Sequence, residues 1–91
     1  MRRKKNQAER EAERAKREAE RARLAHYQND NQVLTFGQWC LLNNFATSTG
    51  RRILAGERGP PPVVTQLSSR RIGITIANNR AWLESRARGA A

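Results

Sequence analysis

The stretch TFGQWCLLNNFATSTGRRILAGERGPPP, residues 35–62, carries two short helical patterns separated by a turn and followed by a firm stop. Thr35 precedes Gln38 by three residues, which is the spacing of a capping box at a helix start. The apolar residues that follow at helical spacing are Phe36, Trp39, Cys40 and Leu42. They predict a first helix at 36–43, and Phe45 is expected to be the buried residue of the turn after it.

A second helix is predicted at 48–55, directly after this turn. Thr47 can cap its start, and Ile53 and Leu54 supply the residues that face the core. Gly56 stands where a glycine commonly ends a helix in the left-handed conformation. The GERGPPP run that follows cannot continue a helix, because proline lacks the backbone N–H group. Two helices joined by so short a turn indicate a helix-turn-helix unit.

The segment VVTQLSSRRIGITI, residues 63–76, predicts a β-hairpin. Its isoleucines alternate with glycine and threonine at a period of two, and β-branched residues precede the turn-like SSR sequence. We therefore predict strands at 63–67 and 71–76. Asn78 then caps a last helix, predicted at 79–87.

The order helix, turn, helix, β-hairpin wing, helix predicts an α+β winged helix-turn-helix domain over residues 33–88. Residues 1–32 are predicted to form a charged arm, helical or partly disordered, and residues 89–91 a tail. A chain of 91 residues can build one small core. Trp39 and Trp82 are expected to lie in it.

The arm consists almost wholly of Arg, Lys, Glu and Ala, which are strong helix formers. Opposite charges at three- or four-residue spacing, such as Glu20 and Arg23, add a few tenths of a kcal/mol each. A heptad seam comprises Ala8, Ala12, Ala15, Ala19, Ala22 and His26. The seam fits a solvated helix whose alanines reflect helix propensity, or a narrow stripe that lets a helix or a DNA backbone come close. Alanine buries too little area to hold a coiled coil, so we expect the arm to be ordered by a neighbour or by DNA.

The charge balance points to an anionic partner. Lys and Arg number 18 against 8 Asp and Glu, which gives a formal net charge of +10. Nucleic acid or an anionic membrane surface is the expected partner of such a chain. The sequence has no apolar run that could span a bilayer and no apolar segment typical of a secretory signal. We therefore expect a cytoplasmic, nucleoid-associated protein.

The sequence gives little support for an enzymatic function. The single histidine lies in the arm, Glu57 and Glu84 are isolated acids, and no phosphate-loop pattern is present. A single cysteine, Cys40, excludes an internal disulfide and a multi-cysteine zinc site, and its place on an apolar helix face favours a buried inert thiol. We expect no enzyme activity, no catalytic residue, no metal and no cofactor.

DNA binding fits the positions of the basic residues. The second helix of a helix-turn-helix enters the major groove, where arginine can contact guanine bidentately. The predicted DNA-binding residues are Thr47, Ser48, Thr49, Arg51, Arg52, Arg58, Arg70 and Arg71. Gly50 either lets the helix approach the DNA groove closely or is simply tolerated. Arg80, Arg86 and Arg88 are weaker candidates that fit a solvated face better.

The segments LTFGQWC, ATSTGRRILAGERGPPPV and RRIGITIANNRAWLESR resemble the excisionases, or recombination directionality factors, of mobile elements. These are small proteins with a MerR-like winged helix, related to prophage regulators, and the resemblance covers residues 33–88. It implies an architectural protein that binds repeats beside an attachment site, assembles head to tail on double-stranded DNA and bends it. An integrase, expected to be of the tyrosine type, is thereby directed toward excision.

By position, the resemblance makes Ser48, Thr49, Arg51 and Arg52 the readers on the recognition helix, and Arg70 and Arg71 the wing contacts. The charged arm and Gly50, which replaces a larger residue, depart from the family pattern. Two alternatives remain. The chain regulates transcription of integrase or excision genes, or it is an adaptor whose basic arm binds an acidic protein.

Overall fold

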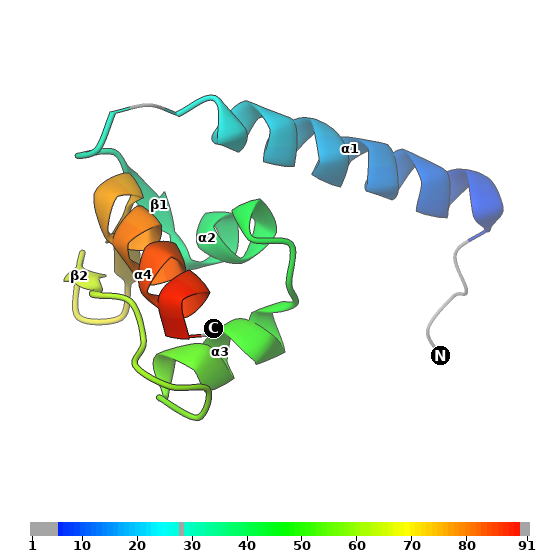
Figure 1. The fold of residues 1–91 in the computed structure, drawn as a ribbon. Coiled ribbons are helices and arrows are strands. Elements are labelled where there is room, and N and C mark those ends of the chain that lie inside the picture. The colour runs from blue at the N-terminus through cyan, green and yellow to red at the C-terminus, as the bar shows by residue number, and fades with distance from the viewer. Residues whose placement is uncertain (1–5, 28, 90–91) are drawn as a thin grey trace.

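The structure is a computed structural model that describes residues 6–27 and 29–89, with the side chains of residues 88 and 89 outside that description. The described part is a small α+β molecule with four helices and a three-stranded antiparallel sheet (Figure 1). The elements are α1 (Gln7–Ala25), β1 (Val33–Thr35), α2 (Phe36–Leu42), α3 (Thr47–Leu54), β2 (Thr65–Gln66), β3 (Ile72–Thr75) and α4 (Ile76–Gly89). This arrangement is compatible with the predicted winged helix-turn-helix.

The predicted start of α2 is confirmed. The Thr35 hydroxyl accepts from the Gln38 backbone N–H at 3.1 Å, and the Gln38 side-chain oxygen accepts from the Thr35 N–H at 3.0 Å. The helix ends at Asn43, and Asn44 takes a left-handed conformation with φ 61°. Phe45 then packs against the core, although it is half-buried and not fully enclosed.

The predicted cap of α3 is wrong. The helix begins at Thr47, one residue early, so that the N-cap position falls on Ala46, which has no side chain able to accept a hydrogen bond. The physical reason is the tightness of the turn, because the Phe45 N–H donates to the Cys40 carbonyl at 3.1 Å and reverses the chain within a few residues. The N–H groups of the first turn of α3 therefore have no side-chain cap.

The predicted end of α3 is confirmed. Gly56 has φ 82°, and its N–H donates to the Ile53 carbonyl at 3.0 Å. The Glu57 N–H donates to the Arg52 carbonyl at 3.1 Å. This pair of bonds is a Schellman motif, which satisfies carbonyls that the end of the helix would otherwise leave unpaired.

The sheet differs from the predicted hairpin in two ways. Its strands β2 and β3 are shorter than predicted, and Val63, 68% exposed, lies outside them. Strand β1 was not predicted, yet it pairs with β3 and places Leu34 opposite Ile74 in the strand order β1-β3-β2. A strand of three residues has too few positions to show a period of two, and its last residue is also the cap of α2.

Helix α4 starts at Ile76 and not at residue 79, and Asn78 is not its cap. The Thr75 hydroxyl accepts from the Asn78 N–H at 3.0 Å. The Ile76 N–H donates to the Gln32 carbonyl at 3.0 Å, and the Ala77 N–H donates to the Asp30 carbonyl. Segment 29–32 thus satisfies the first turn of the helix, which local sequence could not reveal.

The core lies where α2, α3, α4 and the sheet meet. Its buried apolar residues are Leu24, Leu34, Trp39, Cys40, Ile53, Ile74, Ile76 and Trp82. Both tryptophans are therefore in the core, as predicted. Asn79 was not foreseen: its side-chain oxygen accepts from the Trp39 indole N–H and from the Asn43 amide, each at 3.0 Å. It satisfies polar groups that would be costly to bury unpaired.

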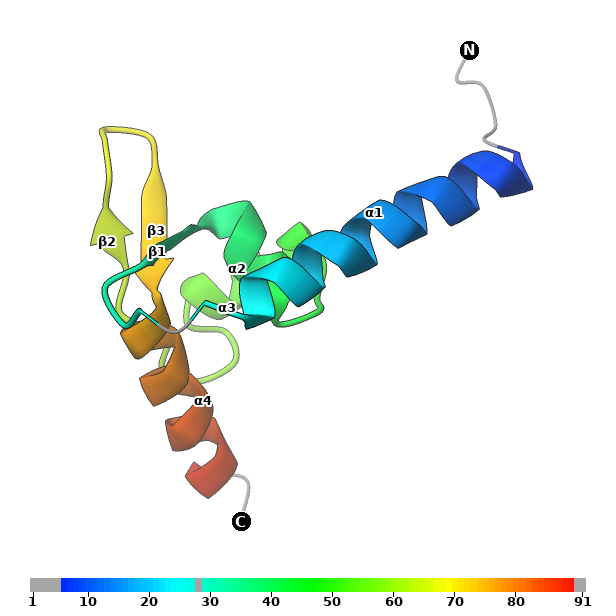
Figure 2. The same cartoon turned by 90° about the horizontal axis from the view of Figure 1, so that it is seen from above.

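The arm is a helix that projects from the domain (Figures 1 and 2). The radius of gyration is 15.1 Å, against about 12 Å for a compact chain of this length. The residues of the alanine seam are exposed, as a solvated helix requires. Leu24, 1% exposed, and Tyr27 nevertheless pack in the core, N-terminal to the predicted domain boundary. Residues 1–5 and 28 of the arm and 90–91 of the tail lie outside the described residues.

Candidate nucleic-acid interface

An open groove runs between α3 and the β2–β3 hairpin, with a volume of about 500 Å³. Its apolar lining comprises Phe36, Leu54, Leu67 and Ile72. Three of the predicted DNA-binding residues, Arg51, Arg70 and Arg71, border it. The fold therefore brings an arginine of α3 together with the arginine pair of the hairpin, across about twenty residues of sequence. We call this feature the α3–hairpin groove.

The hairpin turn is held by its own backbone. The Leu67 N–H donates to the Arg71 carbonyl at 2.8 Å, and the Ser68 N–H donates to the same carbonyl at 3.1 Å. Both arginine side chains at the turn are exposed. A guanidinium carried on such a hairpin can reach the phosphates or the narrow minor groove of a duplex.

The start of α3 is a second polar feature, at the other end of the helix from Leu54, and it borders a separate hollow. Thr47 and Ser48 are exposed there, while Thr49 is half-buried. No side chain caps the helix, so its first N–H groups and its positive dipole end face outward, an arrangement that suits a phosphate oxygen. The sequence did not predict an uncapped helix start, because Thr47 was expected to act as the cap.

Five predicted contact residues lie outside the α3–hairpin groove: Thr47, Ser48 and Thr49 at the start of α3, and the arginines Arg52 and Arg58. Arg52 is exposed on α3, and Arg58 is exposed in the loop after it. The Arg58 backbone carbonyl accepts from the Arg86 guanidinium at 2.7 Å, and that guanidinium also lies 5.2 Å from the centre of the Trp82 ring. Arg86 therefore holds the loop to α4 while its side chain stays exposed, as expected for a solvated face.

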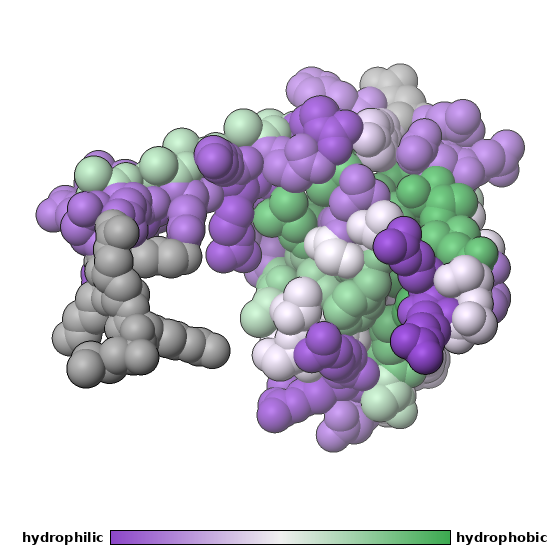
Figure 3. Space-filling view, turned by 180° about the vertical axis from the view of Figure 1, so that it is seen from behind, coloured by the Kyte–Doolittle hydropathy of each residue, from purple (hydrophilic) through white to green (hydrophobic). Residues whose placement is uncertain are grey.

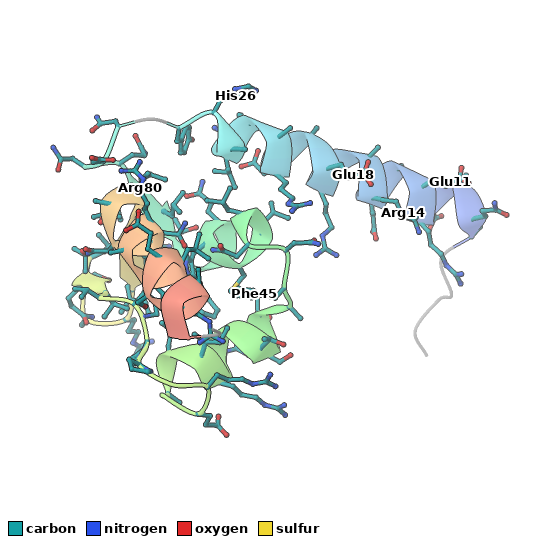
Figure 4. All side chains as sticks on the ribbon, in the orientation of Figure 1. Glu11, Arg14, Glu18, His26, Phe45 and Arg80 are labelled. Carbon is teal, nitrogen blue, oxygen red and sulfur yellow. The ribbon has the colours of Figure 1, made fainter. Side chains whose placement is uncertain are left out.

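Arg80, the other weak candidate with a described side chain, is engaged in an ion pair with Asp30 at 2.8 Å. Figure 4 labels it on α4, at the end nearest the segment that precedes β1. The Arg88 side chain lies outside the described residues. Among the basic residues of the domain, Arg51, Arg70 and Arg71 border the groove, while Arg80 and Arg86 contact other parts of the fold.

Gly50 serves the packing of α3 and does not offer a close approach to DNA. It is buried, and a Cβ built at this position would lie 2.5 Å from Cys40 Sγ and 3.1 Å from the Phe36 ring. The close approach that was predicted for a DNA groove is in fact made with α2. This explains why a larger residue has no room here.

Replacing Gly50 with alanine is therefore expected to destabilise the fold by about 1–3 kcal/mol, because overpacking exceeds the gain in helix propensity. Gly37→Ala is the matched control, since nothing lies within 4 Å of a Cβ there. That control should stabilise by up to about 1 kcal/mol. Denaturant unfolding of both variants measures the difference, and equal effects would contradict the packing role of Gly50.

The buried Cys40 shows no sign of chemistry. Burial raises the pKa of its thiol, while the charge of Arg51 acts in the opposite direction. A thiol with a raised pKa stays protonated and unreactive at neutral pH, in line with the predicted inert role. Among the described residues no His, Cys, Asp and Glu side chains gather as a metal site would need. None of the described helices has the length and apolar character to cross a membrane.

Fold and groove together define a small basic α+β protein with an arginine-bordered surface and an uncapped helix start. Comparison with protein-family models, curated proteins and solved structures found no match to this chain. The resemblance to excisionases therefore stays a prediction from the quoted motifs.

Proposed function

We propose that this chain is a winged-helix protein that binds double-stranded DNA in a sequence-specific manner. Helix α3 enters the major groove, and the β2–β3 hairpin acts as the wing over the adjacent minor groove. The observation that carries the proposal is the convergence of Arg51, Arg70 and Arg71 on one groove. The net charge of +10 and the uncapped start of α3 support it independently.

The role on DNA follows from the motif resemblance. We assign the chain to the excisionase-like architectural proteins, which bind repeats cooperatively, bend DNA and direct an integrase toward excision without catalysis of their own. Regulation of integrase or excision genes is compatible with the same DNA contacts. The adaptor alternative is less favoured, because it assigns no role to the arginines that border the α3–hairpin groove.

The first experiment selects a binding site from random duplexes and compares variants on the selected and a scrambled duplex. Arg51→Ala is expected to weaken binding to the selected site by about 1–3 kcal/mol, the value of a bidentate guanine contact, and to affect the scrambled duplex much less. The double variant Arg70→Ala/Arg71→Ala should weaken both duplexes, because its contacts are mainly to phosphate and groove shape.

Arg80→Ala is the control of equal charge, because Arg80 pairs with Asp30 and lies outside the groove. If all of these variants lose affinity equally on both duplexes, base readout by α3 is wrong. An excision assay with an integrase, run with and without this protein, then separates a directionality factor from a plain repressor.

A further inference from the structure

Four arginines of α1 lie on one side of the arm. They are Arg10, Arg14, Arg17 and Arg21, spaced 4, 3 and 4 residues apart, which places them on one helix face. Together with Leu41 and Asn44 they border a hollow of about 470 Å³ between the arm and the end of α2. We call these four residues the arm stripe.

The arm stripe is continuous with the proposed DNA-binding surface. Arg17 also borders an adjoining hollow together with Phe45, Ala46 and Thr47, the residues that lead into the uncapped start of α3. A phosphate backbone that contacts the first turn of α3 would therefore pass directly to the arm.

The hollow beside the stripe carries more positive than negative charge, because its described lining includes four arginines and two glutamates. The ion pairs of Glu20 with Arg23 and of Asp30 with Arg80 include none of the four arginines. Glu13 and Glu18 border the same hollow and reduce its positive charge in part. The alanine seam lies elsewhere on the helix: Figure 3 shows pale green along the upper edge of the arm and purple below it.

The direction of the arm is set by its anchored end. Leu24 is buried, Tyr27 packs on the core, and Arg23 donates to the Tyr27 hydroxyl at 2.7 Å. In Figure 2 the β2–β3 hairpin lies to the left of α2 and the arm extends to the right of it, and both reach toward the top of the view. In Figure 4, Arg14 lies on the side of the arm nearer the domain and His26 on the opposite side.

We propose that the arm stripe contacts the phosphate backbone of the same duplex that α3 reads, which extends the footprint beyond the α3–hairpin groove. This inference rests on the proposed function. Arg10 to Arg21 spans about 17 Å at ~1.5 Å per residue. At ~3.4 Å of axial rise per phosphate of one strand, that length covers roughly five base pairs of the duplex. Four arginines along one face are thus spaced to neutralise several successive phosphates.

The test replaces all four stripe residues with glutamine, which removes the charge but keeps a polar side chain of similar helix propensity. Binding to a selected duplex long enough to extend past the α3 site is measured across salt concentrations. Each lost phosphate contact lowers the slope of log K against log salt by about 0.9. The variant slope should therefore be smaller by up to about 3.6, so that between 50 and 200 mM salt the wild type loses up to about 150-fold more affinity than the variant.

Arg17→Gln and Lys16→Gln form the matched pair, because the two residues are neighbours with equal charge and only Arg17 borders the hollows. Arg17→Gln should lower the slope by about 0.9 and Lys16→Gln by much less. Equal slopes for this pair, or an unchanged slope in the fourfold variant, would overturn the inference and assign the stripe to an acidic protein surface. If Arg51→Ala still weakens binding in that case, the proposed function survives; if wild type binds no duplex, both fall.

Discussion

Trp39→Ala is expected to lower the free energy of unfolding by about 3–5 kcal/mol, the range for removing a large buried aromatic ring. Trp39 is 0% exposed, and its ring lies 5.0 Å from Phe45 and 5.4 Å from Trp82, measured between ring centres. The substitution removes the side chain around which α2 and α4 pack. A domain of this size has only about 5–15 kcal/mol of stability to lose.

Part of this loss of stability comes from the hydrogen bond that the Trp39 indole N–H donates to Asn79. A second substitution measures that part separately. Asn79→Leu leaves the Trp39 N–H buried without its acceptor, which should cost about 1–3 kcal/mol while the ring stays in place. Denaturant unfolding followed by circular dichroism measures both variants. Leu83→Ala, at a residue 45% exposed, is the control and should cost about 1 kcal/mol or less. A loss below 1 kcal/mol for Trp39→Ala would place the centre of the core elsewhere.

Leu24→Ala is the second large effect, with an expected loss of about 2–5 kcal/mol. Leu24 is 1% exposed, although it belongs to an arm that otherwise faces solvent. Its removal leaves a cavity where α1 meets α2, so the arm should detach as the domain weakens. Deleting residues 1–26 would remove this anchor too, and substitutions are therefore the sounder way to examine the arm.

The measurement pairs Leu24→Ala with Leu24→Met, which keeps the volume of the side chain and should cost less than about 1.5 kcal/mol. Hydrogen exchange at the backbone amides of residues 20–25 reports directly on detachment of the arm. If Leu24→Ala unfolds at the same denaturant concentration as the wild type, the arm is independent of the domain.

Much of the α2–turn–α3 segment was predictable, because its signals are local. A capping box needs only Thr35 and Gln38, and the end of α3 needs only Gly56 in the left-handed conformation. The cap of α3 was wrongly assigned to Thr47, because a threonine beside a helix start carries the same local signal whether it lies just before the helix or within it. The isoleucine alternation was followed one residue too far, since Ile76 is buried in α4 as it would have been in a strand.

The sequence identified the arginines that border the α3–hairpin groove, but it did not predict that they come together there. Arg51, Arg70 and Arg71 were singled out from the sequence, and they border one groove. Arg86 is exposed as expected, but its hydrogen bond to a backbone carbonyl 28 residues earlier could not be predicted from local sequence. The arm stripe was not predicted from the sequence, because only the folded structure places these arginines next to the start of α3.

Local chemistry of the chain determined the start of α2, the end of α3 and the basic balance, and it singled out the arginines that border the α3–hairpin groove, since caps, propensities and charges act within a few residues. The packing of the elements decided the rest. It paired β1 with β3, buried Leu24 and Gly50, and gave the Trp39 indole its acceptor in Asn79. Each of these depends on partners far apart in sequence, whose distances exist only once the chain has folded.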